Sequence, residues 1–162
     1  MNVYKQAVSV NLKVNEKIKT IVATRDKWKY REIFTGAIIC KLFSRHAQLN
    51  VVTDQIGSPT YTVDLALLLC AMAVTDKYGT YHVTNEGVCS WAEFARAIFA
   101  QAGMRVKVNP IPASEYPTRA ARPYNSRMSK AKLTQNSFSK LPAWQDALGR
   151  YLKELGKSKN PV

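Results

Sequence analysis

The 162-residue chain is poor in cysteine and has no long apolar run. Cys40, Cys70 and Cys89 are odd in number and scattered, with no CxxC pair. This pattern argues against a zinc site and a disulfide framework, so we predict no metal ligands and expect a reducing, cytoplasmic setting. The longest apolar run, residues 65–74, has ten residues, whereas a membrane-spanning helix needs about 20. We therefore expect no membrane span, and no secretory signal is predicted at the start of the sequence.

Glycine is also scarce where a dinucleotide would need it. The seven glycines form no cluster, and no turn of the GxxGxxG kind occurs. Such a turn brings backbone N–H groups and a helix N-terminus close to a pyrophosphate. The sequence therefore predicts no cofactor-binding residues of this type.

Acidic residues are few, since 24 Lys and Arg stand against 11 Asp and Glu, for a net charge of +13. Residues 1–50 hold ten basic and three acidic side chains, residues 51–104 two and five, and residues 105–162 twelve and three. The positive charge thus brackets an acidic middle instead of forming one stripe. Nucleic-acid binding remains a weak alternative, because an anionic nucleotide ligand would also favour a basic chain.

From residue 33 onward the apolar spacing predicts alternating helices and strands. The expected helices span 33–43, 62–76, 90–102 and 142–155, and the expected strands span 49–52, 80–84 and 106–108. The helix over 62–76 is apolar almost all round, so it should be covered on most sides. Residues 109–128 contain four prolines and are expected to form a loop, which at this length is usually functional or disordered.

The helix ends carry recognisable signals. Thr62 is expected to cap one helix, and Ser90 with Glu93 predicts a capping box. Pro142 suits a first helical position. Two glycines, Gly103 and Gly156, are expected to end helices. The first 32 residues are less readable, and their apolar residues around position 20 give only a weak strand signal.

Seven short motifs occur in an order and spacing that are specific when taken together. They are VVTDQ at 51–55, GSPT at 57–60, DLA at 64–66, GTYHVTN at 79–85, CSWAEFA at 89–95, ARP at 121–123 with Ser126, and LPAW at 141–144. This series resembles the C-terminal half of the dTDP-4-dehydrorhamnose reductases, a family of extended short-chain dehydrogenases/reductases.

The resemblance implies an α/β fold, with an incomplete remnant of a Rossmann-type sheet and the small mixed α/β substrate-binding domain. Residues 1–32 would be a poorly defined remnant of the catalytic tyrosine region. Residues 33–156 would form the nucleotide-sugar half of the site, and residues 157–162 a flexible tail.

The family uses NADPH to reduce dTDP-4-dehydro-L-rhamnose to dTDP-L-rhamnose, with a Tyr as proton donor and a Lys four residues later. By resemblance Tyr4 is the remnant acid, but Val8 stands where that Lys is expected. An apolar neighbour does not lower the pKa of a phenol. We therefore expect a truncated homologue that recognises a nucleotide sugar, does not bind NADPH by itself and is inactive alone.

The substrate-binding residues that the resemblance implies fall in two loops: Gln55, Gly57, Ser58, Pro59, Thr60, Arg122 and Pro123. The first loop follows a predicted strand, where open α/β sheets bind ligands. A purely structural turn is the alternative, because Gly relaxes the backbone and Ser-Pro favours an extended dipeptide. The guanidinium of Arg122 suits a diphosphate, and a solvated loop arginine is the alternative there.

The expected partner is a dTDP-sugar. A non-catalytic module that pairs with a full-length reductase is an alternative, and so is a homo-oligomer, because strand edges left open favour pairing.

Overall fold

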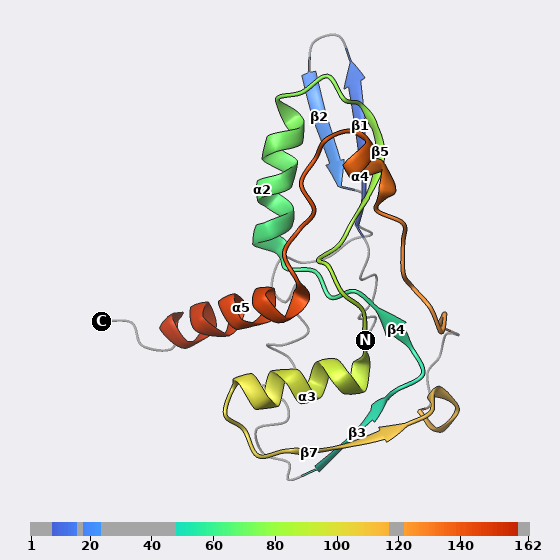
Figure 1. Ribbon diagram of the computed structural model, residues 1–162, viewed down its shortest axis with the longest axis vertical. Helices are drawn as coiled ribbons and strands as arrows, with labels where there is room; N and C mark the ends of the chain where they lie inside the picture. Colours follow the sequence, from blue (N-terminus) through green and yellow to red (C-terminus); the bar gives the residue numbers. More distant parts are fainter. Residues whose placement is uncertain (1–7, 16–17, 24–47, 117–121, 159–162) are drawn as a thin grey trace.

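The computed structural model describes residues 8–15, 18–23, 48–116 and 122–158. Strands and helices alternate along this part of the chain (Figure 1). In order they are β1 (Val8–Asn15), β2 (Ile18–Ala23), β3 (Gln48–Val52), β4 (Ile56–Gly57), α2 (Thr62–Ala73), β5 (Gly79–Val83), β6 (Cys89–Ser90), α3 (Trp91–Gln101), β7 (Lys107–Ile111), the 3-10 turn η1 (Ala113–Glu115), α4 (Ala131–Gln135) and α5 (Trp144–Ser158).

The strands form three small sheets of different kinds. An antiparallel sheet has the order β2-β1-β5, and β4 pairs with β6 in a short antiparallel ribbon. The strands β3 and β7 are parallel, with Leu49 opposite Val108 and Val52 opposite Ile111. A parallel pair needs a crossover connection, which α2, β5 and α3 supply. The α/β fold class expected from the sequence is confirmed.

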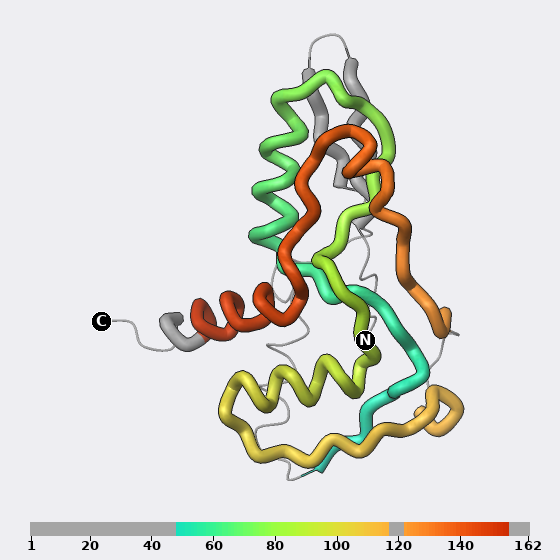
Figure 2. The backbone as a smooth tube through the Cα atoms, in the orientation of Figure 1, coloured from blue at the N-terminus to red at the C-terminus, as the bar shows by residue number. Residues whose placement is uncertain are grey.

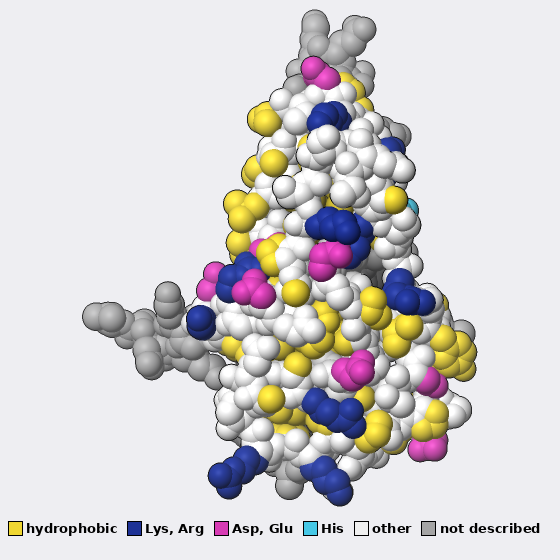
Figure 3. All heavy atoms as spheres, in the orientation of Figure 1, with side chains coloured by type: hydrophobic (Ala, Val, Ile, Leu, Met, Phe, Trp, Pro, Cys, Tyr) yellow, Lys and Arg dark blue, Asp and Glu magenta, His cyan; other side chains and the backbone are white. Residues whose placement is uncertain are grey.

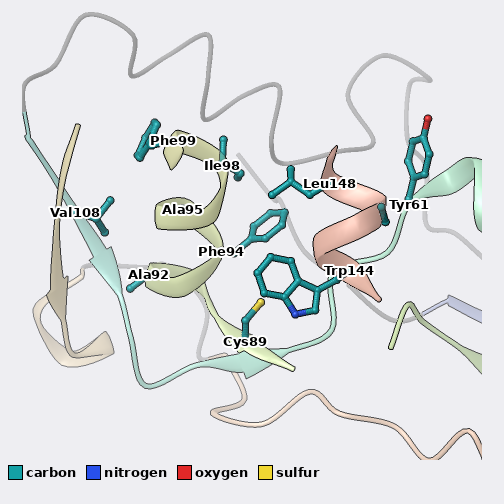
Figure 4. Packing of buried hydrophobic residues seen from close by; sticks show 11 residues of the cluster. Tyr61, Cys89, Ala92, Phe94, Ala95, Ile98, Phe99, Val108, Trp144 and Leu148 are labelled. Carbon is teal, nitrogen blue, oxygen red and sulfur yellow. The ribbon is translucent and has the colours of Figure 1, made fainter. Parts of the chain in front are cut away.

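Among the described residues, one core forms around α3, because its apolar residues recur every three to four positions and face α5 and the parallel strands (Figure 4). The rings of Phe94 and Trp144 meet edge to face, with centroids 5.7 Å apart. Ile98 and Leu148 are fully buried beside them. We call this group the α3 cluster; its buried members are Tyr61, Cys89, Ala92, Phe94, Ala95, Ile98, Phe99, Val108, Trp144, Ala147 and Leu148.

The other core lies towards the opposite end of the long axis, where α2 and α4 pack with β5 (Figure 1). Met72 and Tyr81 are fully buried, and the rings of Tyr81 and Phe138 meet edge to face at 5.5 Å. We call this group the α2 cluster; its buried members are Leu65, Leu68, Met72, Tyr81, Val83, Leu133, Phe138 and Leu141.

The far side of α2 is exposed, so the expectation that this helix is covered on most sides is wrong. Val63 is 42% exposed, Leu67 67% and Val74 81%. Val63 and Leu67 are four residues apart and so lie on one face of the helix, and Val74 is its C-cap. Figure 3 shows the molecule from one side, and on that face the basic side chains stand apart from one another instead of forming a stripe.

Two helix boundaries differ from the expected ones. Tyr61, not Thr62, occupies the N-cap of α2, and the helix ends at Ala73. The helix α5 begins at Trp144, not at Pro142, and continues past Gly156 to Ser158. The chain stays extended at Pro142 because its carbonyl accepts the N–H of Glu86, whose own carbonyl accepts the N–H of Trp144.

Other local expectations are confirmed or extended. The capping box of Ser90 and Glu93 is present at α3, and Gly103 follows the C-cap of that helix with φ of +66°. The strand signal within 18–22 corresponds to β2. The sequence did not predict β1 or α4, and β7 runs on through Pro110. The expected helix over 33–43 lies outside the described residues. In the described part of the chain, no helix is both long and apolar enough to cross a bilayer.

Candidate functional site

The loop between β3 and α2 is held from within by the short strand β4. Ile56 pairs with Ser90 and Gly57 pairs with Cys89. Gly57, Ser58 and Pro59 are buried, and the Ser58 hydroxyl donates a hydrogen bond of 2.7 Å to the Gly87 carbonyl. These three residues hold the backbone of the loop, and Gln55 and Thr60 are its partly exposed polar residues.

The second predicted stretch lies directly beside this loop (Figure 2). The N–H of Ile56 donates to the Tyr124 carbonyl at 2.8 Å, and its carbonyl accepts the N–H and the hydroxyl of Ser126, each at 3.0 Å. Arg122 and Pro123 directly precede Tyr124, the first residue of this stretch that contacts the loop. Arg122 is partly buried, Pro123 is exposed, and the neighbouring Tyr124 is 64% exposed.

The segment that follows β7 also lies beside this loop, at the end of the parallel strand pair. The N–H of Thr53 donates to the Ile111 carbonyl at 2.9 Å. Both carboxylate oxygens of Asp54 then accept the N–H of Ala113 at 3.0 Å. The segments after β3 and β7 thus start together at the carboxyl ends of two parallel strands, which is where α/β sheets place ligands.

The far end of the loop is fastened by a buried polar network. The N–H of Tyr61 donates to Asn85 Oδ1 at 2.8 Å, and Asn85 Nδ2 donates to Asp64 Oδ2 at 2.8 Å and to the Pro142 carbonyl at 2.9 Å. The two terminal nitrogens of Arg150 donate hydrogen bonds to the two carboxylate oxygens of Asp64, at 2.6 and 2.8 Å. Such a bidentate arginine–carboxylate pair is stronger than a single charged hydrogen bond.

The network holds Asp64 ionised. Burial by itself would raise the pKa of this carboxyl, but the hydrogen bonds from Arg150 and Asn85 outweigh burial and hold the pKa below its ordinary value. In the sequence, Asp64 stood out only as part of the DLA motif at 64–66. The roles of Asn85 and Arg150 were missed, because no local pattern marks residues that meet across 86 positions.

The hydroxyl of Tyr61 donates a hydrogen bond of 2.5 Å to Glu154, which lies on α5 together with Arg150. Burial, the hydrogen bond to Glu154 and the charge of Glu154 raise the pKa of Tyr61 to about 12. The guanidinium of Arg150 lies 5.4 Å from the centre of its ring. A phenol with so high a pKa stays protonated at neutral pH, so the Tyr61 hydroxyl serves as a hydrogen-bond donor that connects the start of α2 to α5.

Gly87 is required where the loop meets α5. Its φ is +88°, and a Cβ at this position would lie 2.9 Å from Trp144 Cδ1. Residues other than glycine rarely adopt this backbone conformation. Because the Gly87 carbonyl accepts the Ser58 hydroxyl, this close approach also places the loop. The sequence motifs did not single out Gly87.

Other residues weighed from the sequence lie elsewhere. Burial, followed by the charge of Glu93, raises the pKa of the Cys89 thiol to about 12, whereas Cys70 is exposed. Tyr4 lies outside the described residues, and Val8 is the first residue of β1, opposite Val83. Among the described residues no group of three or more His, Cys, Asp or Glu side chains could hold a metal ion.

The arrangement therefore offers recognition chemistry. An amide, a hydroxyl and a guanidinium, from Gln55, Thr60 and Arg122, belong to segments that meet at the end of β3. Donors of this kind suit the oxygens of a base, a sugar or a diphosphate.

The described residues thus form a small α/β domain, with the candidate site at the ends of two parallel strands. Residues 4–157 match the family described as RmlD substrate binding domain. The chain belongs to this family and corresponds to the C-terminal half of the dTDP-4-dehydrorhamnose reductases.

Individual relatives agree. The chain is 34% identical over 145 residues to the spore coat polysaccharide biosynthesis protein SpsK of Bacillus subtilis, covering 88% of this chain and 50% of that protein. It is 38% identical over 142 residues to the dTDP-4-dehydrorhamnose reductase of Aggregatibacter actinomycetemcomitans, covering 78% and 48%. The chain thus spans about half the length of the curated relatives it matches.

Solved structures show the same fold. The dTDP-4-dehydrorhamnose reductase of Bacillus anthracis, solved in complex with NADP, superposes with a TM-score of 0.70 at 39% identity, over 79% of this chain and 44% of that one. The Clostridium acetobutylicum orthologue gives a TM-score of 0.73 at 34% identity, over 81% and 45%.

Proposed function

We propose that this chain provides the nucleotide-sugar recognition half of a dTDP-4-dehydrorhamnose reductase, with a dTDP-sugar as its ligand. One observation carries the proposal: the loop with Gln55 and residues 57–60 and the stretch that begins with Arg122 and Pro123, which the resemblance implied as substrate-binding, are joined by hydrogen bonds between Ile56 and residues 124 and 126. The membership of the substrate-binding family supports it.

Each of the three partly exposed polar side chains has a distinct task in this proposal. The guanidinium of Arg122 pairs with the diphosphate, because its planar fork matches phosphate oxygens. The amide of Gln55 and the hydroxyl of Thr60 select the sugar or the base by hydrogen bonds. The buried Gly57, Ser58 and Pro59 act indirectly, by holding the backbone of the loop in place.

The reduction itself needs groups that these 162 residues do not supply. The sequence contains no glycine-rich turn and has Val8 four residues after Tyr4. We therefore propose that the isolated chain binds the dTDP-sugar without oxidising NADPH, the cofactor of the family, to which the NADP-bound relative points.

Isothermal titration calorimetry with dTDP and a dTDP-sugar tests this function. We expect saturable binding by the wild-type chain, weakened by about tenfold or more in Arg122→Gln, as for the loss of a charged hydrogen bond. Arg105→Gln is the matched control, since Arg105 is an exposed arginine in the same basic region. Absence of dTDP-sugar binding would contradict the proposed ligand, and NADPH consumption by the isolated chain would contradict its inactivity.

The exposed side of α2 favours a second candidate, pairing with a full-length reductase or with a second copy. Val63, Leu67 and Val74 form an apolar face, and such faces promote association. Size-exclusion chromatography with light scattering, alone and with an intact reductase, tests it. We expect Leu67→Gln to shift any complex towards the monomer, and a wild-type chain that stays monomeric in both samples contradicts this candidate.

A further inference from the structure

The buried network at the end of the candidate loop connects three elements that are distant in sequence. Asp64 lies on α2, Asn85 follows β5, and Arg150 lies on α5. Only the guanidinium end is open to solvent: the Arg150 side chain is 37% exposed, that of Asp64 is 5% exposed, and Asn85 is fully buried.

The chemistry of Asn85 gives this network a direction. Its Oδ1 accepts the N–H of Tyr61, and its Nδ2 donates to the Asp64 carboxylate. A rotated amide would turn its NH₂ group towards the N–H of Tyr61 and its oxygen towards the carboxylate. Both contacts would then pair like with like. The Asp64 carboxylate and the Pro142 carbonyl, which accepts the same NH₂ group at 2.9 Å, together set which way the amide faces, and the amide in turn holds the backbone of Tyr61.

Arg150 in turn fixes the orientation of the Asp64 carboxylate. Its two nitrogens take one oxygen of Asp64 each, so the carboxylate cannot rotate without breaking a charged hydrogen bond. Asp146 accepts a third bond from the same guanidinium at 2.9 Å, from the exposed side. Arg150 thus has an inner carboxylate that belongs to the network and an outer one that does not.

We infer that Asp64 and Arg150 are positioning residues for the candidate site, which act through Asn85 to hold Tyr61 and with it the geometry of residues 55–60. This inference rests on the proposed function for its effect on ligand affinity. Its effect on the backbone of Tyr61 is independent of any ligand.

The test compares Asp64→Asn with Asp146→Asn. The first removes the inner charge with little change of shape, and the second removes only the outer contact. We expect Asp64→Asn to speed hydrogen exchange of the Tyr61 amide by about tenfold and to weaken dTDP binding by about the same factor. Asp146→Asn should leave both unchanged. Arg150→Lys, which keeps the charge without the fork, should lie in between.

A stability-matched control separates positioning from general destabilisation. Phe138→Leu loosens the α2 cluster, to which Tyr61 does not belong, and the denaturant concentration is chosen so that its unfolding free energy equals that of Asp64→Asn. If both variants speed Tyr61 exchange equally, the network is only structural and the inference is wrong. If the wild-type chain fails to bind dTDP, the proposed function falls, while the exchange comparison still decides the inference.

Discussion

Asp64 and Cys89 show how burial and neighbours set the behaviour of single side chains. Asp64 stays ionised in a buried place because Arg150 and Asn85 hydrogen-bond to it. Cys89 is buried beside an acidic residue, and both effects favour its neutral thiol. The pKa of Asp64 is therefore lowered and that of Cys89 raised, so Asp64 favours its charged form and Cys89 its neutral form.

The pKa of Asp64 makes stability depend on acid. In the folded chain this pKa lies below its ordinary value of 3.8, so between the two values the unfolded chain binds more protons. Its contribution is present above 3.8 and is lost as the pH falls through the folded pKa. We expect the wild-type unfolding free energy, measured by urea denaturation, to decline below that pH and the decline to be shallower in Asp64→Asn. Equal slopes would show that Asp64 is not the group concerned.

The cysteines should differ in reactivity. Cys70 is exposed, whereas the thiol of Cys89 is buried with a pKa of about 12, and only the thiolate reacts quickly. We expect iodoacetamide at neutral pH to label Cys70 and to spare Cys89 until the chain is unfolded in urea, as read by peptide mass mapping. Rapid labelling of Cys89 in the folded chain would contradict its burial.

At the scale of elements, two local devices hold the segments that flank the candidate loop. The box of Ser90 and Glu93 starts α3, with hydrogen bonds of 3.1 and 2.7 Å. Gly87 lets the preceding turn approach Trp144 on α5. Both lie on the chain that pairs with β4, so they position the loop as well as their own elements.

Loss of the cap should lower stability. Ser90→Ala removes the acceptor for the N–H of Glu93, and we expect a loss of about 1 kcal/mol in unfolding free energy. Urea denaturation measures it. Ser114→Ala, in the exposed turn η1, is the control and should change little. A Ser90→Ala variant as stable as the wild type would mean that the box adds nothing.

Two glycines separate backbone strain from steric contact. Gly87 and Gly103 both have positive φ, but only at Gly87 does a Cβ meet a neighbour, Trp144, at 2.9 Å. We expect Gly103→Ala to cost about 1–2 kcal/mol for its conformation and Gly87→Ala to cost more. Thermal unfolding compares them, and equal losses would remove the steric part of the argument.

At the scale of the molecule, the α2 cluster and the α3 cluster lie at opposite ends of the long axis (Figure 1). Contacts between α2 and α5 connect them: the pair Asp64–Arg150 and the bond from Tyr61 to Glu154. The candidate loop leads into this junction. Its geometry therefore depends on both cores.

We expect the two clusters to unfold together. In a Trp28→Phe background, the remaining Trp91 and Trp144 report on the α3 cluster. Phe138→Ala in the α2 cluster should nevertheless lower the fluorescence midpoint in urea, by the equivalent of about 3–5 kcal/mol, because cooperative unfolding shares the cost. Phe94→Ala, within the reporting cluster, is the reference. An unchanged midpoint in Phe138→Ala would show two independent units.

Much of the local structure could be predicted from the sequence. The alternation at 80–84, the Ser90 and Glu93 spacing and Gly103 depend on neighbours within a few residues, and the structure confirms them. The predicted start of α5 was wrong because the Pro142 carbonyl accepts the N–H of Glu86, 56 positions away in the chain, and the Glu86 carbonyl accepts the N–H of Trp144. Such a partner leaves no trace in local spacing.

The candidate site divides in the same way. The sequence by itself determined the family, the α/β class and the two loops, because motif order and apolar periodicity are local properties of the chain. Only the tertiary structure decided that Ile56 meets Tyr124 and Ser126, and that Asp64 meets Arg150. Those contacts exist because the packing of the two clusters brings distant segments together, and hydrogen-bonding groups that packing buries must find partners.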